Sequence, residues 1–134
     1  MLSRSDGPQV KVRVFYHDKC FDGACSASLF ARFHRECIAP DAEYKFCGLV
    51  HRAGALFDEN EFIGDENAIV DFKYSTDPRL TGWFDHHQSA FLTPADGEHF
   101  RHDTSGHKLF DPKFRSCTKY IAIIAREKFG LDPV

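Results

Sequence analysis

The sequence predicts an α/β fold, with a mainly parallel, doubly wound sheet of four or five strands flanked by helices. Two observations support this prediction. Short runs rich in β-branched and aromatic residues alternate with segments of helical periodicity, in the order expected of β-α-β units. Apolar residues make up 43% of the 134 residues and include 14 Phe, which is typical of one packed domain.

The first predicted elements are a strand, a helix and a second strand. Val10–Tyr16 is β-branched and aromatic, as in a strand buried on both faces. Phe21–Cys37 combines small residues that allow close packing with bulky Leu and Phe, which predicts a helix that Pro40 ends. Glu43–Val50 predicts a second strand, and Arg52–Asn60 predicts a short helical stretch.

The middle of the chain predicts two more strands and a hairpin. The strands are Ala68–Phe72 and Gly82–Asp85, with a turn or brief helix at Asp77–Leu80 between them. Glu98–Asp103 and His107–Asp111 flank a Thr-Ser-Gly turn, and this pattern signals a β-hairpin.

A capped helix closes the predicted domain. Ser116 is a good N-cap for a helix over Cys117–Phe129, and Gly130 is a good stop. We expect residues 1–9 to be a flexible tail and residues 10–134 to form one domain.

Charge and cysteine content exclude several classes of protein. The net charge is −3 and no Lys/Arg run exceeds two residues, which argues against neutralising the phosphates of long duplex DNA. A nucleotide or short oligonucleotide stays compatible with this charge. Five cysteines without a C-x-x-C pair predict free thiols in a reducing compartment. No signal-peptide or membrane-spanning pattern occurs, so we expect a cytoplasmic protein with no membrane partner.

Three clusters of acidic and His residues each follow a strand-like run. They are His17-Asp18 with Asp22-Gly23, then Asp71, then Asp85-His86-His87. The carboxyl ends of parallel strands share one edge of the sheet, and open α/β sheets bind ligands at that edge. The clusters should therefore converge on one site.

The first cluster suits a metal and an anion. His17 and Asp22 flank a strand-to-helix turn that can fold both toward one point, and mixed nitrogen and oxygen ligands suit manganese. Gly23 allows a ligand to approach the backbone, and the helix N-terminus favours phosphate. The structural alternative is that Asp22 is a helix N-cap and His17 a loop residue with ordinary partners.

The later clusters leave similar alternatives open. Asp71 could bridge two metals, one oxygen to each, or cap the next turn. The His pair in Asp85-His86-His87 could bind a ligand or line a polar turn. The N–H groups at Ser116 could hold a substrate anion, but a plain N-cap is the favoured interpretation.

Taken together, His-Asp-x-x-x-Asp-Gly, Ile-Val-Asp and Phe-Asp-His-His resemble the DHH phosphoesterase superfamily, over Val12 to Phe129. That superfamily includes RecJ-type exonucleases, oligoribonucleases and manganese-dependent pyrophosphatases. The resemblance implies that Asp71 bridges two metals, that His86 binds the second metal, and that Asp85 supports it. It also implies that His87 contacts the substrate phosphate as a proton donor or charge stabiliser.

The resemblance implies a divalent-metal-dependent phosphoesterase. It would hydrolyse a phosphodiester or phosphomonoester of a nucleotide or short oligonucleotide by metal-activated water, with two Mn²⁺ ions, or Mg²⁺ or Co²⁺ instead. One alternative is a non-catalytic, regulatory domain that binds a nucleotide or metal. Another is a pyrophosphate or polyphosphate hydrolase.

Two departures from the family pattern matter. Cys20 occupies the place of an expected Asp, so Asp18 is the candidate for the missing metal ligand. The family's late Asp and its second, substrate-binding domain are also missing. We therefore expect the N-terminal part of a longer protein, with weak hydrolysis and one metal bound more tightly than the other.

Overall fold

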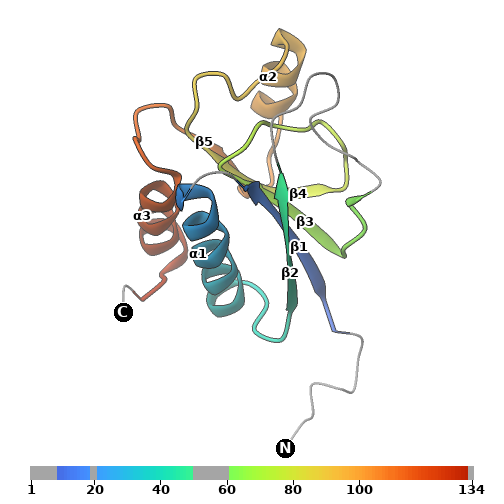
Figure 1. Ribbon diagram of the computed structural model, residues 1–134, viewed down its shortest axis with the longest axis vertical. Coiled ribbons are helices and arrows are strands. Elements are labelled where there is room, and N and C mark those ends of the chain that lie inside the picture. Colours follow the sequence, from blue (N-terminus) through green and yellow to red (C-terminus); the bar gives the residue numbers. More distant parts are fainter. Residues whose placement is uncertain (1–8, 19–20, 50–60, 133–134) are drawn as a thin grey trace, which may run out of the picture.

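The computed structural model describes residues 9–18, 21–49 and 61–132 (Figure 1). The predicted helix over Arg52–Asn60 and the predicted tail, except residue 9, lie outside them. The elements in chain order are β1 (Lys11–His17), α1 (Phe21–Cys37), β2 (Glu43–Leu49), β3 (Glu66–Val70), β4 (Leu80–Asp85), α2 (Pro94–Arg101), β5 (Lys108–Phe110) and α3 (Cys117–Phe129).

The five strands form one sheet in the order β2-β1-β3-β4-β5, and every neighbouring pair is parallel. This confirms the predicted α/β fold. The chain leaves β1 for β2 on one side and continues to β3 on the other. Open α/β sheets bind ligands outside the carboxyl ends of the strands at such a reversal.

Both faces of the sheet are covered by apolar side chains. On one face Val12, Val14 and Val70 pack under α1 and α3, which lie side by side in Figure 1. On the other face, Phe15 and Trp83 pack with aromatic residues that include Phe100 of α2. Successive strand residues point to opposite faces, so the continuous apolar runs follow from burial on both sides.

The two long helices have the bounds that the sequence predicts. Helix α1 buries small residues such as Gly23 and Ala27 against the sheet, together with Phe30 and Phe33. Ser116 caps α3, and Gly130 ends it in the left-handed conformation, with φ 74°. Strong local signals set both ends of these helices.

The predicted hairpin is wrong. Glu98–Asp103 lies partly in α2, whose N-cap Thr93 and first residue Pro94 are a start signal that the sequence reading missed. Strand β5 pairs with β4 in parallel, so no antiparallel hairpin forms. Gly106 does make a turn, with φ 77°, but that turn joins a helix to a parallel strand.

Smaller differences concern strand ends and cysteines. The third strand is Glu66–Val70 rather than Ala68–Phe72, and the fourth begins at Leu80 rather than Gly82. The four cysteines of the described residues are free thiols, as predicted, although only Cys117 is fully buried. Within residues 9–18, 21–49 and 61–132, no helix is both long and apolar enough to cross a membrane.

Candidate metal centre

The strand register brings two of the three clusters together. Val70 of β3 pairs with Phe84 of β4, so Asp71 and the strand-terminal Asp85 lie side by side at the carboxyl edge. Tyr16 of β1 pairs with Val70 on the other side, which places His17 at the same level. Parallel pairing alone therefore aligns the ends of the three strands.

Asp71 has an unusual backbone conformation. Its φ is 58°, and it is the one non-Gly residue with positive φ in the described part of the chain. Asp tolerates the left-handed region better than most residues, but at a cost. The Asp71 N–H still donates to the Phe84 carbonyl at 2.9 Å, so the turn stays attached to β4. The fully buried carboxylate of Asp71 is thus held in a fixed place.

Asp85 is also fully buried, and its two oxygens differ. Its Oδ1 accepts a hydrogen bond from His87 Nδ1 at 2.6 Å. Its Oδ2 has no hydrogen-bond partner among the described residues. A buried carboxylate oxygen without a partner is costly, and in native proteins such an atom usually marks a bound ion, a water or a functional site.

His86 presents one nitrogen to two carboxylates. Its Nδ1 donates to the Phe114 carbonyl at 2.8 Å, and because a carbonyl only accepts, Nδ1 carries the proton. Its Nε2 then lies 3.2 Å from Asp71 Oδ1 and 3.6 Å from Asp22 Oδ2. The contact with Asp71 is a hydrogen bond with one shared proton, and a metal ion bound between these side chains could take the place of that proton. The hydrogen bond from Nδ1 to the Phe114 carbonyl is of the kind that orients metal-binding imidazoles.

These side chains could hold a metal ion together. One potential ligand atom from each of Asp71, Asp85, His86 and His87 lies within 4.8 Å of the others. Two carboxylates and two imidazoles offer mixed oxygen and nitrogen donors, which suit manganese and similar divalent ions. The unpartnered Oδ2 of Asp85 fits the same interpretation.

Burial and charge shift the pKa values of three groups in this centre. Burial, followed by the negative charge of Asp22, raises the pKa of Asp71 to about 6, although both imidazoles oppose the shift. The hydrogen bond that His87 donates to Asp85 raises the pKa of His87, against its partial burial. Burial raises the pKa of Asp22, but hydrogen bonds from Thr118, Cys117 and Ser116 outweigh it and leave that pKa lowered.

The loops that carry Asp71 and His87 are joined to each other. Lys73 Nζ donates to the Ser89 carbonyl at 2.6 Å, and Tyr74 N donates to the Ala90 carbonyl at 3.0 Å. These contacts tie the loop after β3 to the loop after β4, so the two carboxylates and two imidazoles sit on one braced unit.

Asp22 is placed at the edge of this group by α3. It is the second residue of α1, yet its carboxylate accepts hydrogen bonds from the first residues of α3, including the backbone N–H of Cys117 at 2.8 Å and of Thr118 at 3.0 Å. The sequence left a cap for its own helix as the structural alternative to a metal ligand. The structure instead makes Asp22 a partner of α3 that also reaches toward His86.

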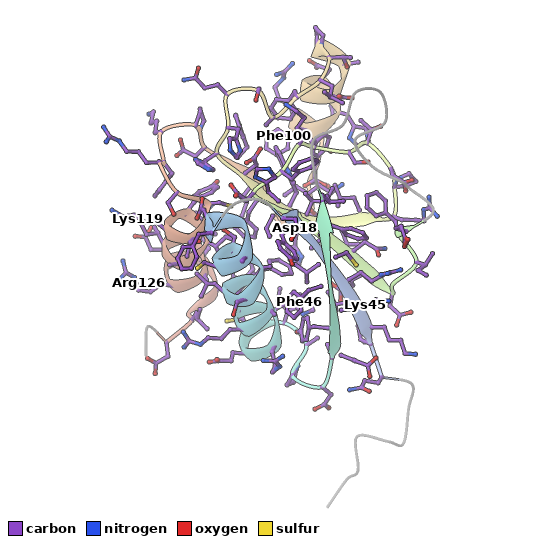
Figure 2. The ribbon with its side chains drawn as sticks, in the orientation of Figure 1. Asp18, Lys45, Phe46, Phe100, Lys119 and Arg126 are labelled. Atoms are coloured by element: carbon purple, nitrogen blue, oxygen red, sulfur yellow. The ribbon has the colours of Figure 1, made fainter. Side chains whose placement is uncertain are left out.

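None of the three predicted ligands of the first cluster is in the four-residue group, although Asp22 lies at its edge. The ring of His17 lies against Phe72, with centroids 5.8 Å apart. The carboxylate of Asp18 lies over Gly48 of β2, where an added Cβ would be 2.7 Å from Asp18 Cγ. Figure 2 shows Asp18 beside the end of β2. Because β2 is on the far side of β1 from β3, Asp18 is turned away from Asp71.

The two predicted substrate contacts outside the third cluster have structural partners. A Cβ on Gly23 would lie 2.1 Å from the His17 carbonyl oxygen, so Gly23 allows α1 to approach the β1 backbone rather than a ligand. Ser116 Oγ accepts from Lys119 N at 3.2 Å as an N-cap and lies 3.0 Å from Asp22 Oδ1. Its capping role is thus the one that the structure shows.

Sequence reasoning missed three contributors to the centre. The Phe114 carbonyl fixes the orientation of His86, and a backbone carbonyl has no sequence signal. Cys117 and Thr118 donate backbone N–H groups to Asp22. The sequence did predict free N–H groups at the start of α3 that could hold an anion. A carboxylate of the same chain can bind such groups as well as a ligand can, and here Asp22 does so.

No protein-family model matches this chain, and neither a curated protein nor a solved structure does. Function is therefore inferred from the residues and their geometry.

Proposed function

We propose that this chain is a divalent-metal-dependent phosphoesterase domain of the DHH type, acting on a nucleotide or short oligonucleotide. The observation that carries the proposal is the convergence of carboxylates and imidazoles at the carboxyl edge, where one buried carboxylate oxygen has no donor among the described residues. Asp85 Oδ2 lacks a hydrogen-bond partner among the described residues, and His86 Nε2 faces two carboxylates. Metal ions would compensate for both features.

The residues then take distinct roles. Asp71 and His86, with Asp85 and Asp22 beside them, would hold Mn²⁺ or a similar ion. A bound divalent metal supplies charge neutralisation of the phosphate and lowers the pKa of water for attack on phosphorus. The side chains of the protein would hold the metal, orient the substrate and transfer protons.

His87 suits proton transfer. Its Nδ1 donates to Asp85, which orients the ring, and its side chain is 45% exposed at the mouth of the centre. Its raised pKa keeps a proton on Nε2 over a wider pH range. From there Nε2 can donate a hydrogen bond to a phosphate oxygen or a proton to the leaving oxygen.

The test combines metal binding with hydrolysis. We expect isothermal titration calorimetry to show Mn²⁺ binding, and a panel of a dinucleotide, p-nitrophenyl phosphate and pyrophosphate to show slow, Mn²⁺-dependent release of product. His87→Ala should reduce turnover while the metal still binds. Absence of Mn²⁺ binding by the whole chain would overturn the proposal.

A non-catalytic, metal-binding domain is the second candidate. It is favoured by the position of Asp18, which is turned toward β2 and adds no oxygen to the group around Asp71. Mn²⁺ binding with no hydrolysis of any panel member would select this candidate. Preferential hydrolysis of pyrophosphate would select the pyrophosphatase alternative.

A further inference from the structure

Asp22 is shared between the metal centre and the start of α3. Asp22 and its hydrogen-bond donors in α3 come from distant parts of the chain, since Asp22 and Thr118 are 96 positions apart. The carboxylate is half-buried, and it connects the N-terminal ends of α1 and α3, the two helices that cover one face of the sheet.

The two oxygens of Asp22 do different things. Oδ1 accepts from Ser116 Oγ at 3.0 Å, from Thr118 N at 3.0 Å and from Thr118 Oγ1 at 2.7 Å. Among the described residues, Oδ2 accepts a single hydrogen bond, from Cys117 N at 2.8 Å, and it lies 3.6 Å from His86 Nε2. Three donors therefore fix Oδ1, while Oδ2 keeps a lone pair that can face the metal centre.

We propose that Ser116 and Thr118 are positioning residues for the metal centre, because their hydroxyls orient Asp22 so that Oδ2 faces His86. This inference rests on the proposed function and deepens it. Neither hydroxyl touches the metal or the substrate. They act through Asp22, as the outer partners of metal ligands do, and losing such a partner typically costs about 10- to 100-fold in metal affinity.

The affinity for the metal should depend on how α3 is docked. Ligand and helix cap use the same carboxylate, so a metal at the centre favours the arrangement in which α3 begins beside α1. In turn, disturbing the first turn of α3 should weaken the metal without removing any ligand. A purely structural role for Ser116 and Thr118 would lower stability alone.

The chain contains a matched control for Ser116. Thr93 is the N-cap of α2 and accepts from Asp96 N at 3.2 Å, the same distance at which Ser116 accepts from Lys119 N. Thr93 is exposed at the start of α2, whereas the Asp22 side chain makes all its hydrogen bonds to other described residues at the start of α3. Loss of either cap costs about 1 kcal/mol of stability.

The experiment compares Ser116→Ala with Thr93→Ala in the full chain, using Mn²⁺ calorimetry and thermal unfolding. Both variants should lose similar thermal stability, and only Ser116→Ala should bind Mn²⁺ about 10-fold more weakly. Thr118→Val should weaken Mn²⁺ binding likewise, and Thr118→Ser, which keeps the hydroxyl, should restore it.

The outcomes separate this inference from the proposed function. If the wild-type chain binds Mn²⁺ and both caps behave alike in calorimetry, the positioning role is refuted while the metal centre stands. If the wild-type chain binds no Mn²⁺, both proposals fail. Hydrogen exchange gives an independent check, because Mn²⁺ should slow exchange of the Cys117 and Thr118 N–H groups in the wild type.

Discussion

Two clusters of buried polar groups lie in different parts of this sheet, and they are satisfied to different degrees. His34 of α1 is 2% exposed, yet both ring nitrogens have partners, Tyr44 Oη at 2.7 Å and Glu66 Oε1 at 2.9 Å. At the carboxyl edge, the equally buried Asp85 leaves one oxygen without a partner among the described residues, and Asp71 carries a positive φ.

The difference indicates what each cluster is for. A buried histidine with both nitrogens paired stabilises one arrangement of helix and strands and needs nothing more. A buried carboxylate oxygen without a donor, such as Asp85 Oδ2 among the described residues, opposes folding unless a cation or water binds it. The comparison therefore supports a structural role for the His34 cluster and the proposed metal site for the cluster around Asp71 and Asp85.

The largest effect on metal binding is expected when Asp71 is replaced. Asp71→Ala should abolish Mn²⁺ binding, a loss of more than about 100-fold, because a direct ligand contributes more than the outer partners that cost 10- to 100-fold. Calorimetry measures it, with His34→Ala as the control that keeps wild-type affinity. Unchanged affinity in Asp71→Ala would show that the metal site is elsewhere.

Removing His34 should affect only stability. His34→Ala leaves a cavity and removes a hydrogen-bond partner from the hydroxyl of Tyr44 and from the carboxylate of Glu66. We therefore expect a loss of about 3 kcal/mol in the free energy of unfolding. Urea denaturation gives the value, and Tyr44→Phe, which removes a single hydrogen bond, should lose about 1 kcal/mol. A large fall in Mn²⁺ affinity in His34→Ala would contradict the division between the two clusters.

Without metal, Asp71 should cost stability in a pH-dependent way. Its pKa is raised from 3.8 to about 6, so the folded state disfavours the ionised carboxylate and stability is lost as the pH rises through this range. Asp71→Asn removes that cost and keeps a residue that tolerates positive φ. We expect a gain of about 2 kcal/mol in unfolding free energy at pH 8.

The gain in Asp71→Asn should disappear as the pH falls below 3.8, where the Asp71 carboxyl is protonated in both states. Thermal unfolding in a chelator across pH 3 to 8 measures it, with Asp85→Asn in parallel. A gain that does not depend on pH would mean that ionisation of Asp71 is not its source.

The smallest effect is expected at His87. His87→Ala should leave Mn²⁺ affinity within about threefold, or about 0.7 kcal/mol, because His87 is assigned to the substrate phosphate. Its ring lies close enough to the other ligand atoms to bind an ion, so calorimetry can decide. A loss as large as that in Asp71→Ala would make His87 a metal ligand.

Local signals in the sequence determined much of the fold. Phe21–Cys37 and Cys117–Phe129 have the bounds that their caps and breakers predict, because capping depends on residues within one turn of the helix end. The convergence of Asp71 with Asp85 and His86 was also predictable. It requires only that the strands be parallel and that each polar cluster follow a strand.

Only the tertiary structure decided which way the functional side chains point. Asp22 and Asp18 are both acidic residues beside β1, yet α3 draws one toward His86 while the other turns to Gly48 of β2. The donors that orient Asp22 come from more than 90 positions away, and His86 is oriented by a backbone carbonyl 28 positions distant. Such contacts depend on how helices dock on the sheet, and no local pattern of residues contains that information.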